Sequence, residues 1–529
     1  MLCANNIGLR FGKRVLFEEV NIKFEGENCY GIIGANGAGK STFLKILSGE
    51  IESTSGEVIL TKGERISVLK QNHKEYDELT VLETVIGGDE ELYKIQKEKD
   101  ELYSKADFTE KDGIRVGILE DLFLKKNGWE AEANAGVLLS GLGVSNDLFE
   151  KKMNELQDKD KVKVLLARAL FGEPDVLLLD EPTNGLDLKS KLWLEDFLAD
   201  FKHTVLVVSH DRHFLNTVCT HMVDIDFEKI TLFVGNYDFW YESSQLLLKQ
   251  MKESNKRKEE KIAELESFIR RFSANASKSK QATSRKKLLE KITLDEIKPS
   301  SRKYPFIDFK PEQRLGKEVF HLEKICIEHN GKEVIHNLNL TIRPQDKIAL
   351  VGQNEIAKTA LFEALSGEKN ITSGKISIGS TVRLSYFPKN HDAYFKEDKT
   401  LTDFLRQYSD VKEDAYVRGF LGRMLFSGEE SLKSLKVLSG GEKVRVILAK
   451  MMQEKGNVLL FDEPTDHLDI ESITALNKGL ERFVGPIVFS SNDQELIETV
   501  CNRILYLKED GTYIDKEMNY SEFLQKYEI

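Results

Sequence analysis

The chain has 529 residues, so ~100–200 residues per domain predicts about three domains. Hydrophobic residues make up 40% of it and charged residues 31%, and the absence of any run of ~18 apolar residues excludes a membrane-spanning helix. Its five cysteines form no Cys-x-x-Cys pair and its first residues lack a secretory signal pattern, so we expect a cytoplasmic protein with reduced thiols and no disulfide or zinc framework. The net charge of -12 argues against nucleic-acid binding, unless positive charge is concentrated in one segment.

The first predicted element with a chemical role is a phosphate-binding loop. A strand-like segment, 28–33, runs into a glycine-rich turn, and a helix is predicted from Lys40 to Leu47. The turn fits the pattern G-x-x-x-x-G-K-[ST], in which backbone N–H groups surround phosphate oxygens, the lysine reaches the terminal phosphates and the hydroxyl binds magnesium. The residues expected to contact a nucleotide are Gly34, Ala35, Asn36, Gly37, Ala38, Gly39, Lys40, Ser41 and Thr42.

The loop recurs later in the chain, which is therefore an internal repeat. Residues 34–41 align with 352–359 at an offset of 318, whereas 176–183 align with 458–465 at an offset of 282. Because the offset falls by 36, the first half holds 36 additional residues between Gln71 and Leu156. This excess predicts an insertion in the first half.

Two short apolar segments, 176–179 and 205–208, are typical of parallel strands that are covered on both faces. Asp180 follows the first of them, where a carboxylate can position magnesium, and Glu181 beside it can polarise water. The loop, these carboxylates and the second copy together predict nucleotide binding, against the alternative of purely structural glycine turns. We expect two domains, at about 1–242 and 313–529.

Residues 243–312 form a predicted linker between these domains. Apolar residues recur from Ile262 to Phe272 at helical spacing, small polar residues follow, and a second apolar seam ends before Pro299. We predict a helical hairpin, whose first helix from about 242 to 272 is ~45 Å long. Its tip, 270–291, carries +7, which leaves -19 on the rest of the chain. The alternative is a solvated connector, but the charge at the tip predicts RNA binding through Arg270, Arg271, Lys278, Lys280, Arg285, Lys286 and Lys287.

Residues 438–442, Leu-Ser-Gly-Gly-Glu, resemble the signature of ATP-binding cassette ATPases, and His210 resembles their switch histidine. Asp187 and Asp469 resemble their D-loop aspartates. Two cassettes, no membrane domain, an insertion and a charged linker resemble the ABC-F class of translation ATPases, and segments 235–241 and 274–280 are similar to its YbiT-like branch. The resemblance implies an α/β fold with two tandem ATP-binding cassette (P-loop NTPase) domains joined by an α-helical hairpin linker. It also implies that the excess at about 80–140 is the arm of this class, and its acidity favours contact with ribosomal protein over RNA.

In this family each ATP lies between the phosphate loop of one cassette and the signature of the other. The resemblance implies a site one that contains every expected part: the first loop together with Gln71, Asp180, Glu181, His210, Ser439, Gly440 and Gly441. Glu181 and His210 are the expected catalytic residues, and magnesium ligands are expected to be Ser41, Gln71 and Asp180. Phe11, 29 residues before Lys40, is a candidate to stack on adenine or to lie in the core, and His329 occupies the same position before Lys358.

Site two departs from the pattern. It retains Gly352, Lys358 and Thr359 of the loop, with Asp462 and Thr359 as expected magnesium ligands and Glu463 as the catalytic carboxylate. Its replaced positions are Asp158 and Lys159 for the signature glycines, Glu355 and Ala357 for loop glycines, Lys389 for Gln71 and Asn492 for His210. Neutral drift is the alternative, but all four altered elements belong to one site. We predict that site one hydrolyses ATP and that site two binds ATP and turns over slowly.

The expected function is that of a cytoplasmic ATPase using ATP and Mg²⁺, a monomer whose two cassettes pair with each other. With its cassettes closed on ATP it would enter the tRNA exit site of a ribosome, direct the basic tip toward tRNA and ribosomal RNA, and leave after hydrolysis. The alternatives are an ATP-binding subunit of a membrane transporter, a DNA-repair ATPase and, within the ribosomal hypothesis, an antibiotic-resistance ATPase that protects the ribosome. The long basic linker argues against a transporter subunit, and no membrane contact is expected.

Overall fold

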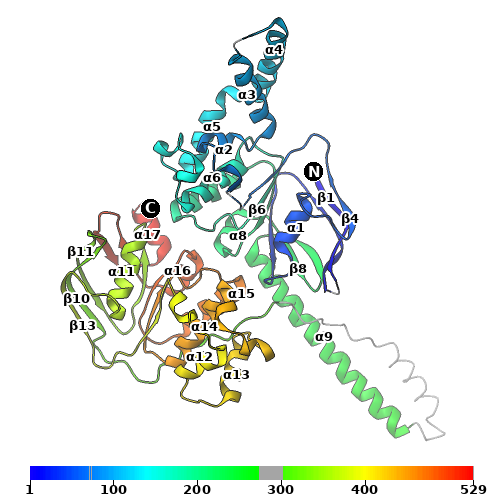
Figure 1. Cartoon of the computed structure of the whole chain (residues 1–529). Helices are drawn as coiled ribbons and strands as arrows, with labels where there is room; N and C mark the ends of the chain where they lie inside the picture. The colour runs from blue at the N-terminus through cyan, green and yellow to red at the C-terminus, as the bar shows by residue number, and fades with distance from the viewer. Residues whose placement is uncertain (13, 71, 73, 106, 273–301, 528–529) are drawn as a thin grey trace.

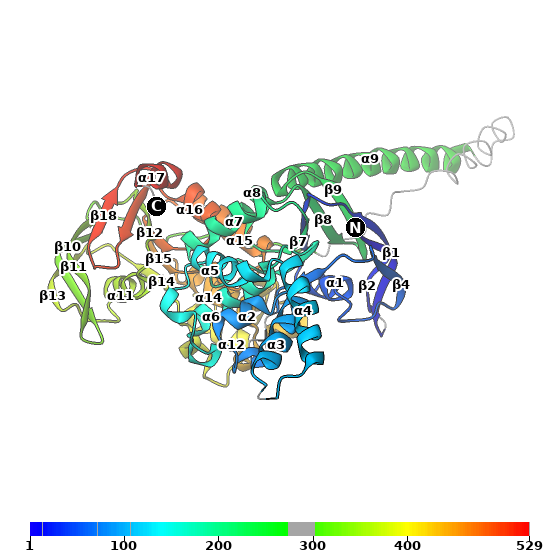
Figure 2. The same cartoon turned by 90° about the horizontal axis from the view of Figure 1, so that it is seen from above.

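The computed structural model describes residues 1–527 except 13, 71, 73, 106 and 273–301. Two cassettes lie beside each other, and a long helix leaves the first of them and projects away from both (Figures 1 and 2). Each cassette contains a three-stranded antiparallel sheet and a six-stranded sheet, as expected for the predicted α/β class.

The first cassette is built on a mostly parallel sheet of order β5-β6-β7-β3-β8-β9, in which β9 alone is antiparallel to its neighbour. Its strands are β5 (Ile66–Val68), β6 (Val176–Asp180), β7 (Thr204–Val208), β3 (Cys29–Gly34), β8 (His221–Asp226) and β9 (Lys229–Val234). The antiparallel sheet has the order β2-β1-β4, with β2 (Arg14–Phe24), β1 (Leu2–Phe11) and β4 (Ser55–Leu60).

Strand β6 shows why the apolar runs form buried strands. Val176 and Leu178 belong to the core that lies under the antiparallel sheet, whereas Leu177 and Leu179 belong to the core on the opposite face. Because side chains alternate between faces and both faces are covered, every position of the run must be apolar. The predicted parallel strands at 176–179 and 205–208 are therefore confirmed.

Helices cover both faces of the large sheet and form a separate arm. Helix α1 (Lys40–Leu47) begins where it was predicted. The remaining helices before the linker are α2 (Val81–Ile86), α3 (Glu90–Tyr103), α4 (Glu110–Lys125), α5 (Ala131–Gly141), α6 (Asp158–Leu170), α7 (Leu188–Ala199) and α8 (Arg212–Val218). Helices α3 and α4 project from the first cassette on the side opposite the long helix in the view of Figure 1.

The second cassette repeats the plan, with a six-stranded sheet of order β14-β15-β16-β12-β17-β18 and an antiparallel sheet of order β11-β10-β13. Its strands are β10 (Phe320–His329), β11 (Lys332–Ile342), β12 (Lys347–Val351), β13 (Ser373–Ile378), β14 (Leu384–Phe387), β15 (Val458–Asp462), β16 (Ile487–Ser490), β17 (Arg503–Leu507) and β18 (Tyr513–Lys516). Its helices are α11 (Glu355–Ser366), α12 (Leu401–Tyr408), α13 (Asp414–Arg423), α14 (Gly440–Glu454), α15 (Ile470–Arg482), α16 (Gln494–Val500) and α17 (Tyr520–Tyr527).

The position of the insertion follows from two equivalent bridges. Thr80 pairs with Lys152 in the first cassette, and Thr400 pairs with Ser434 in the second. The chain between the partners is longer in the first cassette, and α3 and α4 lie within it. Both helices are therefore part of the additional chain that the falling offset predicts.

Helix α9 (Tyr237–Phe272) is the long helix that leaves the first cassette. Its 36 residues give a length of ~54 Å at 1.5 Å per residue. It begins five residues before the expected start near 242 because Tyr237 and Trp240, 5% and 4% exposed, pack into the core of the first cassette. The second helix of the predicted hairpin and most of the predicted basic tip fall outside the described residues.

Within the described part of the chain, none of the helices has the length and apolar character that a membrane span requires.

The two cassettes contact each other through α7 of the first, and through α15 and the residues just before α16 of the second. Lys191 Nζ donates to the backbone carbonyl of Asn492 at 3.1 Å, and Ile470 of the second cassette belongs to a core cluster of the first.

Candidate functional site

The first phosphate loop lies between β3 and α1. Gly34 ends β3 under the Ile225 backbone, where a Cβ atom would lie 2.7 Å from the carbonyl oxygen, so only glycine fits. Gly39 has a φ of 104° and immediately precedes α1, a conformation that glycine adopts without strain. The loop thus remains non-helical up to Lys40, which leaves backbone N–H groups at the start of α1 for an anion.

Lys40 is buried within this loop, with 8% of its surface exposed. Its Nζ donates to the carbonyl oxygens of Gly34 at 2.8 Å and Ala35 at 3.4 Å. Both acceptors are neutral, so the positive charge of Lys40 is not paired by them. Burial lowers the pKa of Lys40, which favours a compensating anion at the loop.

Glu181 and His210 come together at the carboxyl ends of β6 and β7. The backbone N–H of His210 donates to Glu181 Oε2 at 3.2 Å, and His210 Nε2 lies 3.4 Å from Glu181 Oε1. Burial and the neighbouring Asp180 charge raise the pKa of Glu181 to about 7, whereas burial and Lys40 lower the pKa of His210 to about 4. The pair is therefore a carboxyl group suited to accept a proton near neutral pH beside a neutral imidazole.

Glu181 also has a strained backbone, with a φ of 53°, and Glu463 has a φ of 50° at the equivalent position. A left-handed conformation is unfavourable for a side chain of this kind and persists where the surrounding structure requires it. Each of these two glutamates directly follows the aspartate that ends its strand, Asp180 in β6 and Asp462 in β15.

The second cassette contributes charge to site one through the residues around its D-loop. Asp469 accepts from the Ser472 N–H at 2.9 Å and caps α15. The negative charges of Glu471 and Asp469 favour the protonated form of Lys40, against the larger effect of burial on its pKa. The charge of Asp469 has the same effect on the pKa of His210. The expected pairing of the two cassettes therefore places groups of both at the first phosphate loop.

The expected signature residues lie at the start of α14. Ser439 caps this helix and accepts from the Glu442 N–H, and Glu442 accepts in return from the Ser439 N–H. A Cβ atom on Gly441 would lie 2.8 Å from the His467 carbonyl oxygen, and one on Gly440 would lie 3.1 Å from the His467 ring. Glycine at both positions lets the D-loop of the same cassette pack against the signature.

The first cassette reverses this size relationship. Asp158 and Lys159 begin α6 at the positions of the signature glycines, and Gln157 stands where Ser439 does but makes no side-chain cap. Gly185 occupies the position of His467 and has open space around it. In the second cassette a large residue packs against two glycines, whereas the first cassette has a glycine at the position of that large residue and larger residues at the positions of the two glycines.

Site two brings its expected residues together. Thr359 Oγ1 donates to Asp462 Oδ2 at 2.7 Å, and Lys358 Nζ lies 3.5 Å from Glu463 Oε1. Burial raises the pKa of Glu463 to about 7 and also raises that of Asp462. Gly352, like Gly34, lies under backbone, where a Cβ atom would be 2.1 Å from the Leu507 carbonyl oxygen.

The remaining predicted residues are placed less completely. Phe11 ends β1, but its side chain is outside the described part of the structure, and Gln71 lies outside the described residues. His329 ends β10, and its Nδ1 is 3.4 Å from Lys369 Nζ. Arg270 and Arg271 belong to the last turn of α9. The predicted RNA contacts that fall outside the described residues are Lys278, Lys280, Arg285, Lys286 and Lys287.

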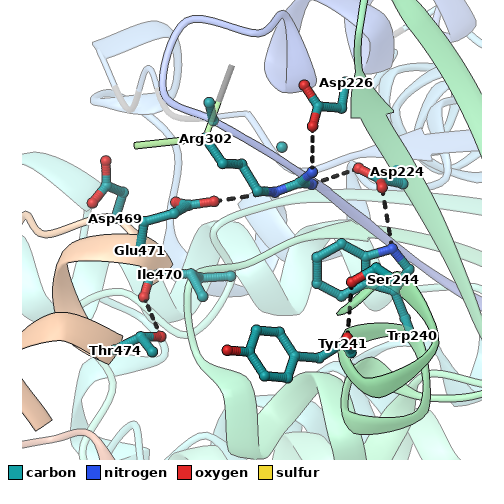
Figure 3. A network of polar contacts seen from close by, with 12 residues as sticks. Asp224, Asp226, Trp240, Tyr241, Ser244, Arg302, Asp469, Ile470, Glu471 and Thr474 are labelled. Atoms are coloured by element: carbon teal, nitrogen blue, oxygen red, sulfur yellow. Dashed lines mark hydrogen bonds and ion pairs between the residues drawn. The ribbon is translucent and has the colours of Figure 1, made fainter. Parts of the chain in front are cut away.

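Arg302 joins the end of the linker to both cassettes (Figure 3). Its guanidinium contacts Asp224 Oδ1 at 2.5 Å and Asp226 Oδ2 at 3.0 Å in the first cassette, and Glu471 Oε1 at 3.2 Å in the second. It also lies 4.8 Å from the ring of Trp240 on α9. Because Glu471 acts on Lys40, this arginine connects the linker to site one.

Sequence reasoning missed Arg302, Glu471 and His467. Comparison of the two halves could have found His467, since Gly185 stands at its position in the first half. Arg302 offers no such signal, because its three carboxylate partners lie far from it in the chain and meet it only in the folded protein.

Comparison with known proteins agrees with this geometry. Residues 17–184 and 335–466 match the cassette family described as "ABC transporter", and residues 223–309 match an extension with the same description. The chain belongs to the ATP-binding cassette family. It is 57% identical over 531 residues to the ABC transporter ATP-binding protein YkpA of Bacillus subtilis (strain 168), covering 100% of this chain and 98% of YkpA. It is 42% identical to the ATP-binding protein YbiT of Escherichia coli O157:H7, with 99% of each chain covered.

These matches confirm the expected likeness to the YbiT branch of the ABC-F class, and they identify the chain as an ATPase with two cassettes. The fold of the RNase-L Inhibitor also matches, with a TM-score of 0.61 at 17% identity, covering 99% of this chain and 92% of that chain. A complex of an archaeal ribosomal stalk protein with the ribosome recycling factor aABCE1 matches with a TM-score of 0.60 at 16% identity, covering 99% and 92%. At this identity the likeness shows a shared tandem-cassette fold.

Site one has a donor set that fits ATP with magnesium. Glu181 Oε1 and His210 Nδ1 are buried and, among the described residues, have no hydrogen-bond partner. Ser41 is the second residue of α1 and Asp180 is the last residue of β6, and hydroxyl and carboxylate oxygen atoms are ligands that Mg²⁺ prefers. The ion, when bound, would neutralise charge on the β- and γ-phosphates, while Lys40 would bind the phosphates and Glu181 would take a proton from water.

Proposed function

We propose that this protein is a cytoplasmic ABC-F ATPase that binds the ribosome near the tRNA exit site in its ATP-bound, closed form and modulates translation. Hydrolysis at site one, with magnesium held by Ser41, Gln71 and Asp180, drives its release. The basic tip contacts tRNA or ribosomal RNA, and the two cassettes pair within a single chain.

The observation that carries this proposal is the junction of site one, the linker and the second cassette. Asp469 and Glu471 of the second cassette act on Lys40, and Glu471 also binds Arg302 at the end of the linker. Closing or opening of the cassettes at site one therefore moves Glu471, a partner of Arg302. Through Arg302, the position of the linker depends on whether site one holds a nucleotide.

Helix α9 supports the ribosomal partner. It extends ~54 Å from the first cassette and ends where the segment of eight basic residues and one acid begins. This distance is several times the Debye length of ~8 Å at physiological salt, so the tip charge does not act on site one. It is available instead for phosphates of nucleic acid, which release counterions when they are neutralised.

The decisive experiment is cosedimentation with ribosomes. The Glu181→Gln variant with ATP should be trapped in the closed form and comigrate with 70S particles in a sucrose gradient. Lys40→Ala, which cannot hold the phosphates, is the matched control and should stay at the top of the gradient. If both variants comigrated with 70S particles, or if neither did, nucleotide-dependent ribosome binding would be contradicted.

The tip is tested separately with Gln at Lys278, Lys280, Arg285, Lys286 and Lys287. This variant should bind ribosomes more weakly and with a shallower dependence on salt, because fewer counterions are released. Its ATPase rate without ribosomes should equal that of the parent. Unchanged ribosome binding would reduce the tip to a connector and favour the transporter-subunit hypothesis, which cosedimentation with membranes would then test.

A further inference from the structure

The two phosphate loops differ in backbone conformation. Helix α1 begins at Lys40, whereas α11 begins at Glu355, three residues before the equivalent Lys358. Glu355 stands where the first loop has Gly37, which has a φ of 76°. Asn354 caps α11 early by accepting from the Ala357 N–H at 3.0 Å. In the second cassette the stretch that should surround phosphate is therefore a turn of helix.

The carboxylate of Glu355 bridges the two cationic side chains of site two. Its Oε1 lies 2.5 Å from Lys358 Nζ, and its Oε2 accepts from Lys389 Nζ at 2.7 Å. Lys358 is 4% exposed and has Glu463 as a second carboxylate neighbour at 3.5 Å. Burial raises the pKa of Glu355, but the two ammonium groups outweigh it and hold that pKa below its usual value. The bridging group is thus a carboxylate.

The register of the sheets supports the alignment of Lys389 with position 71. Val68 of β5 pairs with Leu178, and Tyr386 of β14 pairs with Leu460 of the equivalent acidic strand. In the sequence, Lys389 and Gln71 each stand three residues beyond the equivalent strand residue. Two departures from the pattern, at 355 and 389, form one ion pair, which argues against independent neutral drift.

The contrast with site one indicates what this ion pair does. Lys40 is bonded to neutral carbonyl oxygens of its own loop, so a phosphate can bind its charge without displacing an anion. At site two a phosphate must displace the Glu355 carboxylate from Lys358 and unwind a helical turn. It would also meet Glu355 as a like charge, which disfavours a bound phosphate in a partly buried site.

We propose that the second phosphate loop is locked by its own carboxylate: Glu355 takes the place of a nucleotide phosphate between Lys358 and Lys389, so ATP binds tightly at site one only. This inference rests on the proposed use of ATP at site one. The sequence led us to expect that site two binds ATP and hydrolyses it slowly, whereas this proposal leaves site two without tightly bound ATP. The second cassette then supplies its signature and D-loop to site one, while its own phosphate loop stays blocked.

The test is the stoichiometry of nucleotide binding by the full chain without ribosomes, measured by calorimetric titration with magnesium and AMP-PNP. The parent should bind one nucleotide per chain tightly. Glu355→Gly should unlock the loop and make binding at the second site at least tenfold tighter, so that a second equivalent appears in the titration. Two equally tight sites in the parent, or an unchanged second site in Glu355→Gly, would overturn the proposal.

Two further variants keep the test independent of folding defects. Glu355→Gln retains the size and helical preference of the side chain but removes its charge, and it should also tighten the second site. Gly37→Glu installs the carboxylate in the first loop and should abolish the first binding event. If the parent bound no nucleotide tightly, ATP binding at site one would be refuted instead. The titration therefore distinguishes a failure of the proposed function from a failure of the locked second loop.

Discussion

Replacing Glu181 with Gln removes the carboxylate of site one while preserving its volume. The backbone N–H of Glu181 donates to the Val208 carbonyl oxygen at 2.8 Å, and this contact survives the substitution. Loss of a general base typically lowers a rate by about 10²–10⁴-fold, which corresponds to about 3–5 kcal/mol of transition-state stabilisation. We expect steady-state ATPase to fall by at least about 100-fold.

The matched variant is Glu463→Gln, which makes the same change at a site without an intact signature opposite it. Because we propose that site one supplies the turnover, this variant should retain most of the parent rate. Phosphate release at saturating ATP, measured on both proteins at equal concentration, compares them directly. Similar losses in the two variants would refute the assignment of hydrolysis to site one.

Three other changes are expected to have specific effects. Gly441→Ala places a Cβ atom about 2.8 Å from the His467 carbonyl oxygen and should lower ATPase at least tenfold, whereas Lys159→Ala, at the equivalent position of the first cassette, should leave it unchanged. Glu195 is buried, and burial with the Asp211 charge raises its pKa to about 7 from 4.5, so stability should fall as pH rises from about 4.5 to 7 while the carboxyl of the unfolded chain is already ionised. Glu195→Gln removes this loss, and its unfolding free energy should exceed that of the parent by up to about 3 kcal/mol at pH 8 and by little at pH 5, as urea titration measures. Arg302→Met removes the shared cation of two buried carboxylates, Asp226 and Glu471, and of the half-buried Asp224, and should cost about 3–5 kcal/mol of stability. Exposed Lys303→Met is the control in thermal unfolding.

The sequence predicts those features that are local. The phosphate loop, α1 and the apolar strands each carry their signal in a few consecutive residues, because a glycine turn needs particular φ values and a strand covered on both faces needs an unbroken apolar run. Because the chain is an internal repeat, the same motif pattern can be compared between its two halves. It predicts where the insertion lies and which positions of site two depart from those of site one.

Features that depend on pairs distant in the chain are not predicted. Arg302 and Glu471 are separated by 169 positions, and only the folded arrangement of the chain brings them to 3.2 Å from each other. The early start of α11 is missed for a related reason. From the sequence alone, Glu355 is only a replacement of a loop glycine. In the structure it binds Lys389, which follows β14, and this contact links the second phosphate loop to that segment.

The asymmetry of the two sites is best explained as a division of labour between the cassettes. The first cassette provides an open phosphate loop and the Glu181–His210 pair, whereas the second provides Ser439, the glycines after it and Asp469. Two of the departures in site two, Glu355 and Lys389, form one ion pair. A carboxylate and an ammonium group that replace the two expected residues and bind each other argue against independent loss of function at these positions. We therefore infer that the second cassette serves to complete site one, and Arg302 connects the linker to Glu471, whose charge acts on Lys40.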